Sequence, residues 1–333
     1  MAVRTFEQPL SAAAMTQVMT DLMAGRLPED EVRVFLTTLA RRGETAEELA
    51  AAVQVLRSHA VPLPLSRPLA LCDTCGTGGD QQGTFNISTL AALVAAAAGV
   101  RIAKHGNRAA SSRCGSADLL EALGFNLHAR PEQVARCIEE VGFGFCFAPA
   151  FHPAMKAVAP LRKALGIRTL FNLIGPLANP APLAYQLVGV ADARLLRPMA
   201  EALVRLGVRR GLVVHGADGL DEVTTTGPTQ ALEVRGPAVT ERRIDAAELG
   251  IARVSVEALR GGDAAHNARL TRELFEGRQP ALRDVVTLNA ACVLYIAEQA
   301  PSIADGLSLA SRALTSGAVG QLLARVKELS HAG

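Results

Sequence analysis

The N-terminal part of the chain, residues 1–60, spaces its apolar side chains with the period of amphipathic helices. Apolar residues at 15, 18, 19 and 22 share one helical face, and Gly25 follows as a stop signal. Pro28 suits the first turn of a second helix, and Thr45 with Glu48 has the spacing of a capping box that opens a third. The sequence therefore predicts an all-helical start.

The pattern changes after the proline-rich segment at residues 61–68, which cannot form a helix. Short apolar runs then alternate with stretches of helical period, which is typical of a mostly parallel sheet with helices on its faces. Strands are predicted at residues 69–72, 100–103, 143–147, 185–190, 211–215 and 231–234. Helices are predicted at residues 89–98, 116–123, 131–141, 194–206, 264–276 and 284–298. The segment 250–333 is expected to be helical, with a polar loop near Gly261 and Gly262.

The predicted fold class is α/β, with a small all-helical N-terminal domain and a large α/β domain whose mostly parallel central sheet is flanked by helices. Residues 1–65 are assigned to the small domain. The segment at about 159–182 is too long and too apolar for a loop, so we expect it to leave the sheet, pack on the N-terminal helices and return. The large domain then comprises residues 69–158 and 183–333.

Composition narrows the possible functions. The chain has 333 residues, of which 49% are apolar and 20% charged, so it can bury a large core. A formal net charge of +2 and the absence of Trp argue against a nucleic-acid surface. Because there is no apolar run of membrane-spanning length and no signal-peptide core, we expect a cytoplasmic protein without membrane or nucleic-acid partners.

Cysteine spacing invites a metal or redox interpretation at Cys72-x-x-Cys75. A structural zinc site would need a second pair, and the sequence has none. We therefore interpret both cysteines as small buried residues.

Two loops rich in glycine and hydroxyl groups follow consecutive predicted strands. Residues 73–80 include glycines at 76, 78 and 79, which permit positive φ and let backbone N–H groups approach an anion. Ser88 is expected to cap the next helix, whose N-terminus offers free N–H groups. Lys104 and Arg108 add positive charge after the second strand. Because ligands of α/β sheets bind at such strand ends, these loops predict a phosphate site.

Asp221 and Glu222 are adjacent carboxylates at the end of another predicted strand. Such hard oxygen ligands suit Mg²⁺ that is also held by water and substrate phosphates. Arg162 and Arg168 either face a cleft between the domains or lie on a solvated helix face. The sequence shows no convincing nucleophile, so we expect a phosphosugar or polyphosphate to be handled by position and charge.

Six stretches resemble anthranilate phosphoribosyltransferases, and the resemblance covers essentially the whole chain. They are residues 76–80, 84–89, 104–108, 111–118, 168–180 and 219–222. The resemblance implies transfer of a phosphoribosyl group from 5-phosphoribosyl 1-pyrophosphate (PRPP) to the amine of anthranilate, with Mg²⁺, in tryptophan biosynthesis. It also implies the fold of the nucleoside-phosphorylase-like phosphoribosyltransferases and a homodimer formed through the helical domain.

The resemblance also implies roles for individual residues. Those expected to act in catalysis are Lys104, His105, Asn107 and Arg162. PRPP is expected to contact Gly76, Gly79, Asp80, Thr84, Asn86, Ile87, Ser88, Thr89, Lys104, Asn107, Arg108, Ser111, Ser112 and Ser116. Anthranilate is expected to contact Gly76, His105, Asn107, His152, Arg162 and Gly175. Mg²⁺ is expected to be bound by Ser88, Asp221 and Glu222.

One departure from the family pattern concerns the glycine loop. The family commonly has a glycine directly after Gly-Gly-Asp, whereas this chain has Gln81 and Gln82 before Gly83. The conformation of this loop is therefore not predicted by the resemblance.

Two other functions are compatible with parts of the pattern. A pyrimidine-nucleoside phosphorylase would share the architecture, but it would need a base-recognition motif in place of Arg162 and residues 168–180. A catalytically silent relative that binds nucleic acid should lack the acidic pair and carry a basic face, which this nearly neutral chain does not suggest.

Overall fold

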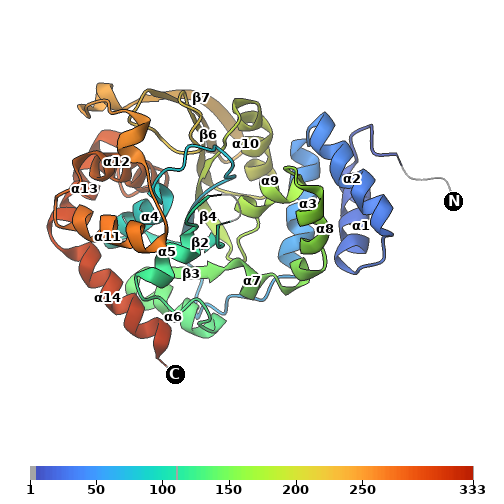
Figure 1. Cartoon of the computed structure of the whole chain (residues 1–333), viewed down its shortest axis with the longest axis horizontal. Coiled ribbons are helices and arrows are strands. Elements are labelled where there is room, and N and C mark those ends of the chain that lie inside the picture. The colour runs from blue at the N-terminus through green and yellow to red at the C-terminus, as the bar shows by residue number, and fades with distance from the viewer. Residues whose placement is uncertain (1–4, 110–111, 333) are drawn as a thin grey trace.

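The computed structural model describes residues 5–109 and 112–332, which form two lobes (Figure 1). The smaller lobe contains α1 (Ala12–Met23), α2 (Glu29–Arg42) and α3 (Ala46–Ser58). The predicted capping box of α3 is confirmed, because Thr45 and Glu48 each accept a hydrogen bond from the other's backbone N–H. The buried Glu48 carboxylate also pairs with Arg42 of α2 and accepts from the Leu10 N–H at 2.8 Å, so it ties α3 to α2 and to the segment that leads into α1.

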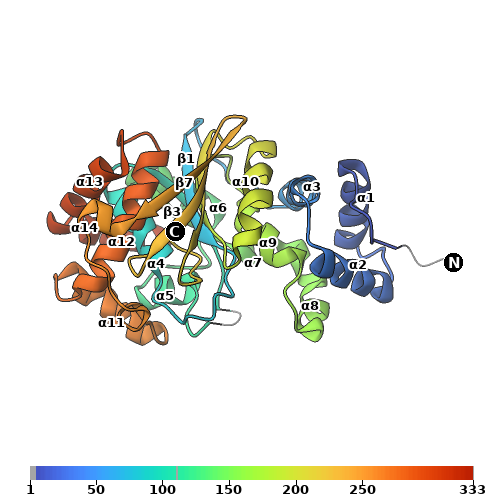
Figure 2. The same cartoon turned by 90° about the horizontal axis from the view of Figure 1, so that it is seen from above.

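Three short helices connect the lobes. They are α7 (Ala148–Phe151), α8 (Ala159–Leu165) and α9 (Leu170–Leu177). Both α8 and α9 contact α2, and α9 also packs on α3 (Figure 2). From α3, Arg57 Nη2 donates to the Leu177 carbonyl at 2.6 Å, which fixes the C-terminal end of α9 just before the chain returns to the sheet.

In the described residues the larger lobe is built on one seven-stranded sheet, in the order β3-β2-β1-β4-β5-β6-β7. Neighbours from β3 through to β5 are parallel, and the pairs β5–β6 and β6–β7 are antiparallel. The strands are β1 (Leu71–Gly76), β2 (Arg101–Gly106), β3 (Phe143–Phe147), β4 (Leu183–Gly189), β5 (Arg210–Gly216), β6 (Pro228–Arg235) and β7 (Ala238–Asp245). The sequence analysis missed β7, because its mostly exposed, charged side chains carry no apolar alternation.

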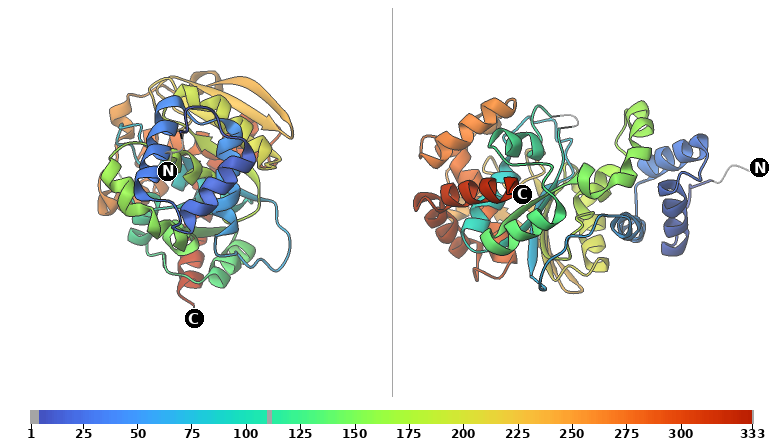
Figure 3. Two further views of the ribbon diagram at one scale, coloured as in Figure 1. Left: turned by 90° about the vertical axis from the view of Figure 1, so that its right-hand side faces the viewer. Right: turned by 90° about the horizontal axis from the view of Figure 1, so that it is seen from below.

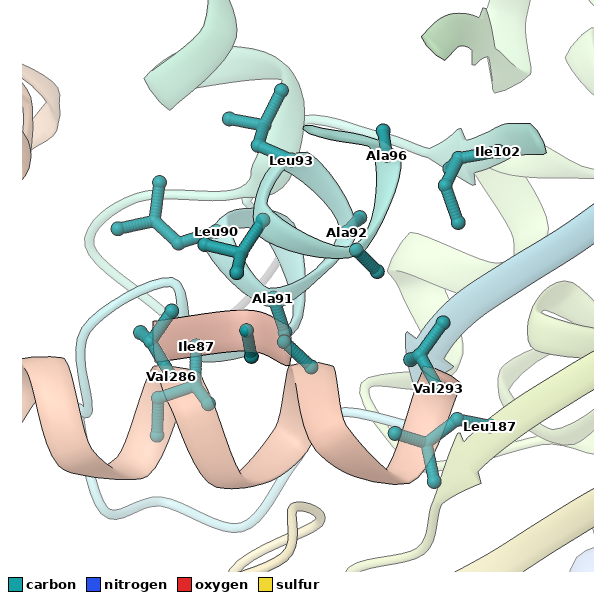
Figure 4. Packing of buried hydrophobic residues seen from close by; sticks show 14 of the residues in the cluster. Ile87, Leu90, Ala91, Ala92, Leu93, Ala96, Ile102, Leu187, Val286 and Val293 are labelled. Atoms are coloured by element: carbon teal, nitrogen blue, oxygen red, sulfur yellow. The ribbon is translucent and has the colours of Figure 1, made fainter. Parts of the chain in front are cut away.

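Helices cover both faces of the sheet. On one face α4 lies against α12, and Ile87 and Ala91 of α4 face Val286 of α12 (Figure 4). The small alanines of α4 let the helices approach closely. On the other face α10 packs between the sheet and α3 (Figure 3). The helices of this lobe are α4 (Ile87–Ala97), α5 (Ser116–Ala122), α6 (Pro131–Val141), α10 (Leu196–Arg205), α11 (Ala264–Phe275), α12 (Pro280–Ile296), α13 (Ile303–Thr315) and α14 (Ala318–His331).

The C-terminal region differs from the prediction in one respect. Residues 250–263 contain no α-helix. They form an irregular connection with one short 3-10 turn, Val256–Leu259. Within the described residues, no helix combines the length and the apolar character that crossing a membrane requires.

Candidate active site

The site lies where the direction of strand addition reverses in the parallel part of the sheet, between β1 and β4. The carboxyl ends of these strands, Gly76 and Gly189, are register partners. Beyond them the Thr77 N–H donates to the Gly189 carbonyl at 2.9 Å. Such a switch point opens a crevice in which ligands of α/β sheets bind.

The glycine loop that follows β1 turns its backbone toward this crevice. Gly78 and Gly79 have φ of +66° and +81°, in the left-handed region that favours glycine. The loop leads to α4, which begins at Ile87 with Asn86 as its N-cap. The prediction that Ser88 caps this helix is therefore wrong: Asn86 donates its side chain to the Cys114 carbonyl at 3.0 Å, and Ser88 lies in the first turn with its N–H free of the helix ladder.

The loop accommodates Gln81 and Gln82 in a left-handed turn that stays in contact with the acidic loop. Gln81 itself adopts the left-handed conformation, with φ of +58°, and Gly83 follows with φ of +63°. A glutamine in this region costs about 1 kcal/mol relative to glycine. The Gln82 side chain offsets that cost by donating from Nε2 to the Asp218 carbonyl at 3.0 Å, which links the glycine loop to the acidic loop.

The acidic pair reaches the glycine loop directly. The Gly78 N–H donates to Asp221 Oδ2 at 2.7 Å, and the Ser88 N–H donates to Glu222 Oε1 at 3.1 Å. Asp221 fits because neither neighbouring strand end has a side chain: a Cβ at Gly76 would lie 2.8 Å from Asp221 Cγ, and one at Gly189 would fall on the Asp221 carbonyl. Two segments far apart in sequence thus meet at one point.

Burial in the crevice perturbs these carboxylates. It raises the pKa of Glu222 to about 8, and the neighbouring Asp221 charge adds to the effect. The pKa of Asp221 is also raised, first by burial and then by repulsion from Asp80. Lys104 opposes the rise at Glu222 and Arg168 opposes it at Asp221, but neither cancels it. A divalent ion would relieve both the desolvation and the repulsion. An adjacent Asp-Glu pair fits Mg²⁺, which takes a few carboxylate oxygens and completes its shell with water and phosphate.

Lys104 and His105 are fixed by a buried hydrogen-bond network. Asp73, which is fully buried, accepts from the His105 N–H at 3.2 Å and from Asn179 Nδ2 at 2.8 Å. Lys104 is 2% exposed, and its Nζ donates to the Thr74 carbonyl at 2.6 Å. Burial raises the pKa of Asp73 to about 6, whereas Lys104 and these hydrogen bonds oppose the rise.

A cavity of about 390 Å³ opens beside the glycine loop, between the lobes. All six residues expected to contact anthranilate line it, although they come from β1, β2, the loop after β2, α8, α9 and the segment after α7. They are Gly76, His105, Asn107, His152, Arg162 and Gly175. No carboxylate is among its lining residues in the part of the chain that the structure describes.

The charged groups of the cavity are cations. The Arg162 guanidinium stacks over the Phe171 ring with 5.1 Å to the ring centroid, and burial lowers its pKa. Lys156, from the 3-10 turn Pro153–Ala157, lies exposed at the cavity wall. Neither cation has an ion-pair partner among the described residues. The cavity therefore favours an anion with an apolar body.

Two histidines face each other across the cavity wall. The ring centroids of His105 and His152 are 5.1 Å apart in an edge-to-face arrangement. Burial lowers the pKa of His105 to about 3 and also lowers that of His152, so both rings are neutral near pH 7. Among the described residues, no hydrogen bond of good geometry reaches Nε2 of His105 or either ring nitrogen of His152, although backbone groups of Gly175 lie near the first ring and those of Leu56 and Ala178 near the second. A polar group of a ligand can therefore pair with them.

The remaining residues assigned to PRPP lie in or next to the loops that follow β1 and β2. Arg108 forms ion pairs with Asp118 and Glu121 of α5, so those pairs must open before it can bind a ligand. Ile87 and Thr89 are 1% exposed, so they would contribute only through their backbone. Ser111 lies outside the described residues. The positions that remain at the loops are Gly79, Asp80, Thr84, Ser112 and Ser116.

Two family models together match most of the chain. The profile described as "Glycosyl transferase family, helical bundle domain" matches residues 3–60, and "Glycosyl transferase family, a/b domain" matches residues 69–319. The anthranilate phosphoribosyltransferase of Rubrobacter xylanophilus is 49% identical over 324 residues, which cover 97% of this chain and 94% of that protein. The chain belongs to the anthranilate phosphoribosyltransferase family.

Solved structures of anthranilate phosphoribosyltransferases share the fold. The enzyme of Thermus thermophilus superposes with a TM-score of 0.93 at 47% identity, over 98% of this chain and 97% of that chain. The Saccharomyces cerevisiae enzyme in complex with PRPP and Mg gives 0.88 at 27% identity, over 96% and 93%. The predicted fold class, a small helical domain and a large α/β domain with a mostly parallel sheet, is thereby confirmed.

At this anthranilate phosphoribosyltransferase site, Arg168 takes a place that the sequence left open between two alternatives, and Lys156 is a residue that the sequence did not single out. Arg168 lies against the glycine loop, where a Cβ at Gly79 would be 3.4 Å from its Nη1. Lys156 stands alone in sequence, and no local pattern marks it. A lysine close to Arg162 in the inter-lobe segment was the only available signal.

Proposed function

We propose that this chain transfers the 5-phosphoribosyl group of PRPP to the amine of anthranilate, with release of pyrophosphate, as a step of tryptophan biosynthesis. The observation that carries the proposal is that a glycine loop, an acidic pair and a cationic cavity meet at one switch point of the sheet. Membership of the family supports the same reaction, and a yeast relative has been crystallised with PRPP and Mg.

The glycine loop and the acidic pair are proposed to hold the diphosphate of PRPP from two sides. The N–H groups of Gly78 and Ser88 donate to the carboxylates of Asp221 and Glu222 in this structure. When those carboxylates turn to the metal, the same N–H groups would become available to phosphate oxygens. Mg²⁺ held by Asp221, Glu222 and the Ser88 hydroxyl would supply positive charge for the departing pyrophosphate. Lys104 would add positive charge beside the pyrophosphate, and Asp80 would add negative charge beside the metal.

The cavity is proposed to bind anthranilate. Arg162 can hold the carboxylate through two parallel hydrogen bonds, and Phe171 behind it keeps the guanidinium plane in place. Lys156 attracts the same negative charge at the wall. The neutral rings of His105 and His152 offer acceptor nitrogens without adding charge, and Asn107 and Gly175 complete the wall toward Gly76. This geometry aims the aryl amine at the sugar carbon beside the glycine loop.

The domain assignment is proposed in the same terms. Residues 1–65 with the segment 159–182 would move as one unit against the rest of the chain, and closure would narrow the cavity between them. Arg57, which joins α3 to the end of α9, supports this grouping. A homodimer through the helical lobe is proposed from the family resemblance, and its test is the mass of the purified protein in solution.

The experiment that tests the function follows anthranilate fluorescence in the presence of the protein, PRPP and Mg²⁺. Formation of N-(5′-phosphoribosyl)anthranilate removes the signal, and the expected loss depends on both PRPP and the metal. A stable signal, in a preparation whose helix content and melting transition show a folded protein, contradicts the proposal. Omitting each substrate in turn is the control.

A further inference from the structure

Asn289 lies in the middle of α12 with no exposed surface. Its Oδ1 accepts from the Val223 N–H at 3.1 Å, and its Nδ2 donates to the Val223 carbonyl at 2.7 Å. A further bond from Nδ2 to the Val285 carbonyl, at 2.9 Å, fixes the side chain on its own helix. One buried amide therefore satisfies both backbone groups of the residue that directly follows Glu222.

The acidic loop needs such an anchor because it has no regular secondary structure. Residues 219–226 belong to no helix or strand. On one side of the acidic pair, Leu220 is fully buried and its carbonyl accepts from the Gly216 N–H at 2.9 Å. On the other side, Val223 is fully buried. Its backbone N–H and its carbonyl are both hydrogen-bonded to the Asn289 side chain. The pair is thus held at both ends while its carboxylates face the glycine loop.

We propose that Asn289 is a positioning residue for the acidic pair: by clamping the Val223 backbone it holds Asp221 and Glu222 against the glycine loop in the geometry that binds the metal. The inference rests on the proposed role of Asp221 and Glu222 in binding Mg²⁺. It gives α12 a direct part in assembling the site. Loss of the amide would leave two buried backbone groups unpaired, and the loop would shift to rehydrate them.

A matched control separates positioning from general stability. Val293 lies on the same helix, is fully buried and packs in the core beside Leu187 of β4 (Figure 4). Val293→Ala removes core packing and leaves both hydrogen bonds between Asn289 and Val223 in place. Asn289→Ala and Val293→Ala are therefore compared at temperatures equally far below their own melting transitions.

The test measures Mn²⁺ binding to the full-length protein from the loss of the free-ion electron paramagnetic resonance signal. We expect Asn289→Ala to weaken Mn²⁺ binding at least 10-fold and Val293→Ala to leave it within 2-fold of wild type. Steady-state kinetics with PRPP and Mg²⁺ should show the same split, with the metal requirement raised in Asn289→Ala and the KM for anthranilate unchanged.

Equal Mn²⁺ affinities for Asn289→Ala and Val293→Ala would overturn the inference. If Asn289→Ala does not fold, Asn289→Ser replaces it, since a serine hydroxyl is too short to reach both the N–H and the carbonyl of Val223. Weaker Mn²⁺ binding than in Val293→Ala would again support the inference, and equal binding would overturn it. Failure of the wild-type protein to bind Mn²⁺ would refute the metal assignment and the inference with it. Binding by a wild type that forms no product would refute the proposed reaction alone.

Discussion

Gly76→Ala is the substitution that most directly connects the two halves of the site. A Cβ at Gly76 would lie 2.8 Å from Asp221 Cγ and closer still to Oδ2. Carbon atoms in contact normally lie about 3.5–4.0 Å apart, so the Asp221 carboxylate would have to move by roughly 1 Å. The backbone at Gly76 is not in the left-handed region, so alanine adds no conformational strain of its own.

The expected consequence is a loss of activity larger than the loss of stability. A misplacement of about 1 Å in a positioned group costs roughly 100-fold in rate, or about 2.7 kcal/mol. We therefore expect kcat/KM for PRPP to fall about 100-fold in Gly76→Ala. Gly227→Ala is the control, because its Cβ would meet only the Ala217 side chain, at an ordinary 3.7 Å.

A double-mutant cycle identifies the cause. In an Asp221→Ala background the clash with the carboxylate is absent, so adding Gly76→Ala should cost less than 3-fold. The assay is the fluorescence-based initial rate with PRPP and Mg²⁺ varied. Full additivity of the two substitutions, or a single Gly76→Ala variant within 3-fold of wild type, would show that Asp221 does not act from the position described.

Three further predictions concern the cavity. Arg162→Ala should raise the KM for anthranilate roughly 10- to 100-fold, as expected for a lost charge-assisted hydrogen bond, with the KM for PRPP nearly constant; equal effects on both would make the arginine structural. Lys156→Gln should raise the KM for anthranilate several-fold at low salt and less at high salt, since screening weakens an exposed charge; salt-independent kinetics would exclude this role. The pKa of His105 is lowered to about 3, so below pH 6.5 the unfolded chain gains its proton first. In denaturant titrations between pH 6.5 and 5, the unfolding free energy of the wild type should therefore fall more steeply than that of His105→Asn, by about 1.1 kcal/mol per pH unit. Parallel slopes would show a normal histidine.

Much of the fold could be predicted because it depends on local periodicity. The bounds of α6 (Pro131–Val141) match the prediction, since a proline opens the helix and a glycine ends it. The loops at the ends of β1 and β2 were found because glycine, hydroxyl and charged residues cluster there. The strand β7 was missed because a polar edge strand has no apolar signal of its own.

The contacts that assemble the site could not be predicted from the sequence. Asn179 reaches Asp73 over 106 residues, and Asn289 reaches Val223 over 66. A lone asparagine has the same local signature whether it is exposed or clamps a buried loop, so only the fold distinguishes the two. Arg108 shows the reverse case, because its motif implied a ligand whereas the structure pairs it with α5.

In the proposed complex, the glycine-loop amides and the acidic pair hold one diphosphate through magnesium. Calorimetric titration of pyrophosphate into wild type and into the Asp221→Asn/Glu222→Gln double variant, with and without Mg²⁺, tests it most directly. We expect Mg²⁺ to strengthen pyrophosphate binding at least 10-fold in wild type and to have no such effect in the double variant. An equal Mg²⁺ enhancement in both proteins would contradict it.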